Sequence, residues 1–176
     1  MKKIRLIALL GIFTALHVIL SSFYIPLFDN SRIMFTFVIT AITCLIVGPK
    51  YAIIYGFAYD TLGHLIHPFG AYFFGYPITA MVTCLIYSIG FYQKKLTITR
   101  IIITKTLVNL IAHIFLNSLW SYMLYSKGYL YYLGQSLIKN IILLPIEIIV
   151  LIVTFKLLLK IFNKHNFNLT KKIDLI

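Results

Sequence analysis

Six apolar segments follow one another along the chain, separated by short stretches that carry proline, glycine or charged residues. An α-helix of about 20 apolar residues crosses the hydrocarbon core of a bilayer, which is roughly 30 Å thick. The pattern therefore predicts an all-α integral membrane protein, a six-transmembrane-helix bundle that forms a single membrane domain over residues 1–176. The predicted helices span residues 4–23, 33–47, 50–66, 72–92, 101–125 and 134–162.

Helix-breaking residues mark the boundaries between these segments. Residues 24–32 contain Pro26 and several other loop-forming residues, so a loop is predicted between the first two helices. Gly48 and Pro49 stand together, which is typical of a helix end followed directly by a new start. Pro68 ends the third segment in the same way.

One row of polar residues interrupts the apolar pattern of the fifth segment. Lys105, Asn109, His113, Asn117 and Ser121 occupy every fourth position. A four-residue step drifts by about 40° on an α-helix, so the row winds slowly around one side. Lipid offers no partner for amide, imidazole or ammonium groups. We therefore expect the row to face the interior of the bundle, where it would contact a polar ligand.

Composition and charge place the protein in the membrane and orient it there. The chain is 61% hydrophobic and 11% charged, whereas a soluble domain is usually about 25% charged. The net charge of +12 arises from basic residues concentrated in the loops and ends of one side, a pattern of membrane topology rather than of nucleic-acid binding. Both termini are therefore predicted to be cytoplasmic, and the first apolar segment, too long for a signal peptide, is interpreted as a retained helix. The basic residues predicted on the cytoplasmic side are Lys2, Lys3, Arg5, Lys50, Lys94, Lys95, Arg100, Lys164, Lys171 and Lys172.

Ionisable residues within the predicted helices are candidates for function because burying a charge in a membrane is costly. Asp60 and His64 are neighbours on one helical face, either as a structural polar pair or as groups that face a ligand. Lys105 and Lys139 are other possible partners for Asp60. Glu147 follows a helix-kinking proline and is interpreted as part of an internal salt bridge, as a protonated acid or as a proton relay.

Three further residues suit the recognition of a flat, anionic ligand. Asn117 and Trp120 share a helical face and offer hydrogen bonds to the edge of a ring and stacking on its face. Arg32 opens the second predicted helix, where it is either an interfacial anchor or a cation at the mouth of a cavity. Trp120 has the simpler alternative of an interface-belt residue.

Small residues recur at helical spacing on two predicted helices and allow another helix to approach closely. Packing within the bundle and docking of a partner membrane protein are both open interpretations. The residues are Ala8, Gly11 and Ala15 in the first helix, and Ala52 and Gly56 in the third.

Motifs of catalysis and energy conversion are missing from the sequence. It contains no Walker loop, no dinucleotide-binding glycine pattern, no metalloprotease motif and no nucleophile elbow. We therefore expect no enzymatic activity, no cofactor and no metal, and any energy source for transport would lie on another chain.

Several local runs, in this order and spacing, resemble the substrate-binding S component of energy-coupling factor (ECF) vitamin transporters, most closely the folate-specific one. The resemblance covers about residues 32–158. The runs are Arg32-Ile33-Met34-Phe35, Gly48-Pro49, the residues from Gly56 to Gly63, those from Pro68 to Phe74, those from Leu116 to Trp120, and Lys139 with Pro145-Ile146.

The resemblance implies a multi-pass protein of a prokaryotic cell membrane that binds folate or a related pterin in an outward cavity. It also implies docking to a transmembrane coupling subunit that is driven by two ATPase subunits. Substrate-binding positions would include Arg32, Asn117, Trp120 and Lys139, and the small residues of the first and third helices would dock the coupling subunit. The chain has Ser136 where the family tends to have an arginine, which weakens the expectation of an anchored glutamate tail.

Three alternatives remain open at this stage. The chain resembles S components closely enough that another flat anionic vitamin is possible as the ligand. Glu147 and Asp60 also suit a solitary proton-coupled carrier. A small intramembrane enzyme using Asp60, His64 and His113 as acid and base groups is the third.

Overall fold

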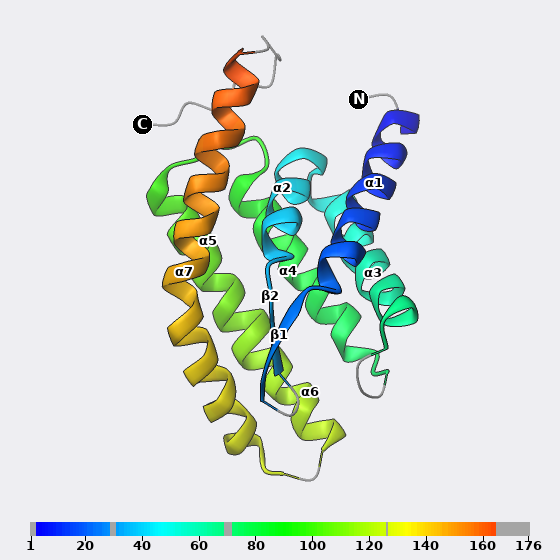
Figure 1. Cartoon of the computed structure of the whole chain (residues 1–176), viewed down its shortest axis with the longest axis vertical. Coiled ribbons are helices and arrows are strands. Elements are labelled where there is room, and N and C mark those ends of the chain that lie inside the picture. The colour runs from blue at the N-terminus through cyan, green and yellow to red at the C-terminus, as the bar shows by residue number, and fades with distance from the viewer. Residues whose placement is uncertain (1–2, 29–30, 69–71, 126, 165–176) are drawn as a thin grey trace.

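The computed structural model describes residues 3–28, 31–68, 72–125 and 127–164 of the chain. The protein is predominantly helical, and its helices pack side by side around an interior space (Figure 1). The elements are α1 (Lys3–Ser21), β1 (Tyr24–Phe28), β2 (Ser31–Met34), α2 (Phe37–Val47), α3 (Pro49–Ile66), α4 (Gly75–Phe91), α5 (Ile98–Val108), the π-helix η1 (Asn109–Leu116), α6 (Asn117–Leu124) and α7 (Tyr129–Lys164).

A β-hairpin occupies the segment that was predicted to be a loop and the start of the second helix. β1 and β2 are antiparallel, with Tyr24 opposite Met34 and Ile25 opposite Ile33. As a result α2 begins at Phe37 rather than at residue 33. A short apolar run has no periodicity that separates strand from helix, which explains the error. Pro26 fits the hairpin because each strand of a two-stranded sheet has one unpaired edge.

The fifth predicted helix is continuous but changes its winding. α5, η1 and α6 follow one another without a break, and η1 is a π-helix. A π-helix closes its hydrogen bonds from residue i to i+5 and so has more residues in each turn than an α-helix. Asn109, His113 and Asn117, four positions apart, therefore drift less around the axis than they would on an α-helix. The change in winding keeps the polar row on one side of the helix.

The turn between α2 and α3 depends on a glycine. Gly48 has φ of +79°, a backbone conformation that residues with a side chain rarely adopt, and a Cβ there would approach the ring of Tyr92 to 2.9 Å. Pro49 then begins α3, at the position where a helix tolerates proline best.

α3 packs closely on α4. A Cβ at Gly56 would lie 2.8 Å from the carbonyl oxygen of Ala80, so the absence of a side chain lets the two backbones meet. Ala52 is fully buried. Ala52 and Gly56 thus serve internal packing, and their expected role in docking a partner is corrected. Ala8, Gly11 and Ala15 are exposed on α1.

The exposed surface is apolar enough for lipid. Among the described residues, three helical stretches are long and apolar enough to cross a membrane, 4–21, 98–124 and 129–160, and α2 and α4 are shorter apolar helices. α7 exposes a series of large apolar side chains, of which Ile141 is 69% exposed. The chain is therefore an all-α membrane protein with one small hairpin. The start of α1 and the end of α7 lie at the same end of the molecule (Figure 1).

Candidate ligand-binding cavity

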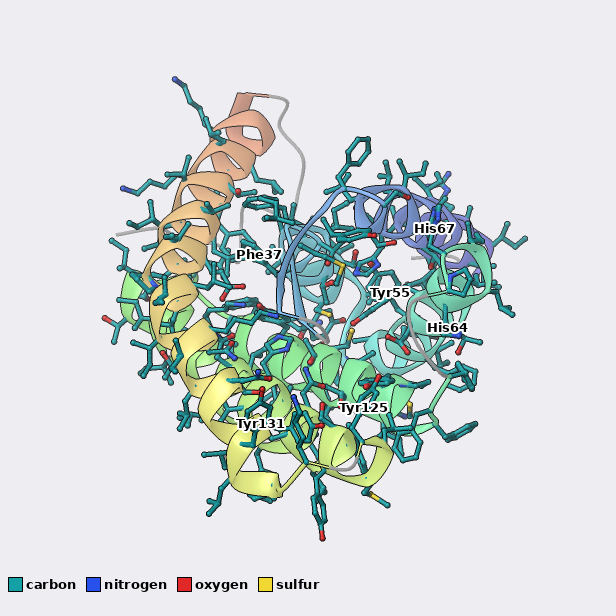
Figure 2. The ribbon with its side chains drawn as sticks, turned by 60° about the horizontal axis from the view of Figure 1, so that its bottom comes forward. Phe37, Tyr55, His64, His67, Tyr125 and Tyr131 are labelled. Atoms are coloured by element: carbon teal, nitrogen blue, oxygen red, sulfur yellow. The ribbon has the colours of Figure 1, made fainter. Side chains whose placement is uncertain are left out.

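A cavity of about 330 Å³ lies inside the bundle. Its walls come from α1, α3, α4, η1, α6 and α7. Residues from Met34, at the end of β2, to Thr40, in the first turn of α2, line one further side. Figure 2 looks onto the end at which α3 ends and α7 begins, with His64 and His67 on one side and Tyr125 and Tyr131 on the other. We call this end the mouth of the cavity, and the opposite part, around Glu147, its floor.

Of the residues predicted to bind substrate, four line the cavity. Asp60 and His64 contribute from α3, Asn117 from α6 and Lys139 from α7. These residues are far apart in sequence, and the antiparallel packing of the helices brings them around one space. The expectation that the polar row faces inward is met by His113, Asn117 and Ser121, which also line it.

Trp120 occupies a different place from the one expected for a ring-stacking residue, since it is not among the residues that line the cavity. Its indole Nε1 donates a hydrogen bond to the hydroxyl of Thr79 at 2.9 Å, and its ring packs at 5.6 Å from that of Phe73. Thr79 itself lines the cavity. Trp120 therefore supports the wall from behind.

Arg32 lies in β2, where its backbone faces Pro26 across the hairpin. Its side chain falls outside the part of the chain that the structure describes, so its predicted role stays a prediction. The hairpin reaches the cavity through Met34, which is among the lining residues.

An aromatic wall, which the sequence did not predict, faces the cavity from α1 and α3. The rings of His17 and Tyr59 lie 3.8 Å apart, and the ring of Tyr55 follows at 5.0 Å from that of Tyr59. His17 and Tyr59 both line the cavity. A histidine in an otherwise apolar first helix was the one available signal, because such a residue needs an interior position in a membrane protein.

The floor carries a buried ion pair between α5 and α7. Lys105 Nζ lies 3.0 Å from Glu147 Oε2, and Asn109 Nδ2 donates to the same oxygen at 3.1 Å. The ammonium of Lys105 also lies 4.8 Å from the centre of the Phe37 ring. Glu147 lines the cavity, whereas Lys105 is fully buried behind Phe37. The internal salt bridge considered for Glu147 is thus the observed arrangement, and its partner is Lys105.

Hydrogen bonds join α6 and α7 along another side of the cavity. Ser118 Oγ on α6 donates toward Ser136 Oγ at 3.0 Å and the backbone carbonyl of Tyr132 at 3.4 Å, both on α7. Within α7, Asn140 Nδ2 donates to the backbone carbonyl of Ser136 at 2.8 Å. Ser136 and Asn140 line the cavity. The wall therefore presents small neutral polar groups around Ser136, the position at which the family that the sequence resembles tends to have an arginine.

The mouth is linked differently. Ser22, just after α1, and His67, at the end of α3, are joined by a hydrogen bond of 2.7 Å between Oγ and Nε2. The ring of His64 lies 5.0 Å from that of Tyr72. These contacts bring the outer ends of α1, α3 and the segment before α4 together.

A family model for the substrate-specific component of ECF transporters matches residues 5–155. The chain belongs to this family. Its members are the substrate-binding parts of transporters, so the family is not one of enzymes. This membership agrees with a helical membrane protein whose interior holds a polar cavity.

Two similar proteins are named as folate transporters, and a similar solved structure holds folic acid. Folate transporter FolT of Clostridium novyi (strain NT) is 30% identical over 166 residues, which cover 93% of this chain and 96% of the relative. Folate transporter FolT of Leuconostoc mesenteroides subsp. mesenteroides is 32% identical over 150 residues, covering 82% and 80%. Among solved structures, the crystal structure of FolT bound with folic acid matches with a TM-score of 0.77 and 31% identity, covering 82% of this chain and 89% of that one.

Proposed function

We propose that this chain is the folate-binding S component of an ATP-driven ECF transporter. The observation that carries the proposal is the cavity of about 330 Å³, in a fold that matches FolT bound with folic acid over 82% of the chain. The two relatives named as folate transporters support the same ligand.

The chemistry of the lining suits folate, which joins a flat heterocycle to an aromatic ring and an anionic glutamate tail. His17 and Tyr59 offer aromatic surface to a flat ring, and Asn117 offers an amide to its edge. Lys139 provides a cation for the anionic part, with Arg32 as a second predicted cation. Ligand sites of this kind combine an apolar or aromatic surface with a few placed polar groups.

Six membrane crossings with both termini in the cytoplasm remain our proposal for the topology. The uneven distribution of lysine and arginine supports it, as does the position of the start of α1 and the end of α7 at one end (Figure 1). The mouth of the cavity then faces the exterior of a prokaryotic cell. Cysteine accessibility on the two faces of intact cells would contradict this orientation if Lys95→Cys were labelled from outside.

The chain needs partners because it has no nucleotide-binding motif. We propose that a transmembrane coupling subunit, driven by two ATPase subunits, docks on the exposed small residues of α1. A Cβ at Gly11 would meet no atom within 4 Å, so this surface leaves room for a close helix. Gly11→Leu should then prevent recovery of the complex while leaving folate binding intact.

Calorimetry on the purified full chain tests the ligand. Folic acid should bind, whereas riboflavin and thiamine, offered under the same conditions, should not. Native mass spectrometry of the gently purified chain would identify a different vitamin if one co-purifies. Absence of folate binding in both measurements would contradict the proposal. Accumulation of substrate in liposomes that contain this chain alone, under a proton gradient, would favour a solitary carrier instead.

A further inference from the structure

The two oxygens of the Glu147 carboxylate are in different situations. Lys105 and Asn109 both contact Oε2, at 3.0 and 3.1 Å. Glu147 also lines the cavity, and its side chain keeps 17% of its exposure. Because both of these contacts use Oε2, the described residues leave Oε1 as an acceptor at the floor. The two donors lie four residues apart on the continuous helix formed by α5 and η1, and together they hold Oε2 in place.

Phe37 decides which member of the ion pair a ligand meets. It lines the cavity and lies against the ammonium of Lys105, at 4.8 Å from the ring centre, whereas Lys105 itself does not line the cavity. A ligand at the floor therefore meets the acid and not the cation. Lys105 is a positioning residue that holds Glu147 in place and balances its charge.

Tyr87 supplies a second unsatisfied group, buried in the wall of the cavity. It projects from α4, is fully buried and lines the cavity. Its hydroxyl has no hydrogen-bond partner among the described residues. A buried hydroxyl without a partner is unfavourable, and in a binding site a ligand commonly provides the missing bond. A phenol donates readily to a carbonyl oxygen.

We propose that Glu147 and Tyr87 recognise the amino-amide edge of the ligand's heterocycle, a role that rests on the proposed folate function. That edge carries an amino group, a ring N–H and a carbonyl side by side. The free oxygen of Glu147 accepts from the N–H donors, and the hydroxyl of Tyr87 donates to the carbonyl. In this assignment the heterocycle lies at the floor of the cavity, and Glu147 rather than Asp60 is the acid that contacts it.

The distribution of charge along α7 agrees with this orientation. Lys139 lies eight residues before Glu147, which corresponds to about 12 Å along the helix axis at 1.5 Å per residue. Both residues line the cavity. A ligand with a donor-rich ring at one end and anionic groups toward the other therefore meets an acid at the floor and a cation nearer the mouth.

The test compares two ligands on the purified full chain by calorimetry. The first is folic acid, and the second is its analogue with the 2-amino group replaced by methyl. We expect the wild type to prefer folic acid at least tenfold, since a hydrogen bond to a charged group is worth about one to two powers of ten in affinity. Tyr87→Phe, which removes only the hydroxyl, should weaken folic acid about three- to tenfold.

Glu147→Gln is the decisive variant. Its amide has a single oxygen, which Lys105 and Asn109 would occupy, so the NH2 group would face the N–H donors of the ligand. We expect the preference for folic acid to fall below about threefold. Asp60→Asn makes the same acid-to-amide change at the other acid that lines the cavity, and it tests the competing assignment, in which Asp60 is the acid that contacts the heterocycle. If Glu147→Gln does not fold, Lys105→Met/Glu147→Leu removes both charges and should also lose the preference.

The outcomes separate the two proposals. If the wild type binds neither compound, the folate function itself fails. If it binds folic acid but shows no preference over the analogue, or keeps the preference in both Glu147 variants, the assignment of Glu147 is overturned while folate binding stands. Loss of the preference in Asp60→Asn alone would return the role to Asp60. Unchanged folate affinity in Tyr87→Phe would remove that hydroxyl from the site.

Discussion

The floor of the cavity and its mouth are both polar, but they are held in different ways. At the floor, a buried lysine and an asparagine on the continuous helix formed by α5 and η1 hold Glu147 in place. At the mouth, the hydrogen bond between Ser22 and His67 joins two exposed residues. Buried polar groups must keep their partners, whereas exposed ones can exchange them for water. The floor therefore suits ligand discrimination, and the mouth suits ligand entry.

The largest effect is expected from removing the cation of the floor. Lys105→Met leaves the carboxylate of Glu147 without its charge partner in the interior. The loss should be about 3 to 5 kcal/mol in the free energy of unfolding, measured by denaturation in detergent. Lys105→Met/Glu147→Leu, which removes both charges, should stay close to the wild type. Equal losses in the two variants would mean that packing, not charge balance, holds the floor.

A second effect concerns the wall behind the cavity, where α3 meets α4. Gly56→Ala places a Cβ against the backbone of Ala80 and should cost about 1 to 3 kcal/mol of stability. Gly11→Ala is the matched control, because its Cβ meets nothing within 4 Å and alanine favours a helix. Thermal unfolding of both variants should separate them. Similar stabilities would show that the wall is as adaptable as the mouth.

The support given by Trp120 leads to a third prediction. Trp120→Ala removes the hydrogen bond to Thr79 and the packing on Phe73, so the wall loses its backing. Folate affinity should fall at least tenfold, about 1.4 kcal/mol, by calorimetry. Tyr122→Ala, at an exposed position on the same helix, should leave the affinity unchanged. An unchanged affinity in Trp120→Ala would place the residue outside the functional structure.

The smallest effect is expected at the mouth. His67→Ala and Ser22→Ala each remove the same exposed hydrogen bond, which should change the equilibrium affinity for folate by less than about threefold. Association rates, followed through the fluorescence of the single tryptophan, should change more than affinity does. A tenfold loss of affinity in either variant would contradict the contrast between mouth and floor.

Much of the helical framework and part of the cavity could be predicted from the sequence. The apolar segments correspond to helices because, in lipid, an α-helix is the one kind of separate segment that makes all of its backbone hydrogen bonds within itself. Asp60, His64, Asn117 and Lys139 were identified as polar residues that had to face inward, and all four line the cavity. That argument uses the solvent alone and needs no knowledge of the neighbouring helices.

Other features could not be predicted from the sequence because they depend on which residues of other elements lie in contact with a given side chain. Ala52 and Gly56 are small residues at helical spacing, as are Ala8 and Gly11, yet the first pair is buried and the second is exposed. Trp120 shares a helical face with Asn117 but lies behind Thr79. The hairpin escaped for a related reason, since a short apolar strand is recognised only by the strand it pairs with.

The order of apolar and polar residues along the chain is enough to predict that this protein lies in a membrane, is built mainly of helices and has a row of polar residues that faces inward. Those properties follow from the free-energy cost of exposing polar groups to lipid, which applies to each segment independently of its neighbours. Three features depend on how the helices pack: Lys105 pairs with Glu147, Phe37 covers the lysine, and the hydroxyl of Tyr87 has no partner within the part of the chain that the structure describes. Two residues on different helices touch only if the helices have the right position along their axes and the right rotation relative to one another. The packing of the helices sets both.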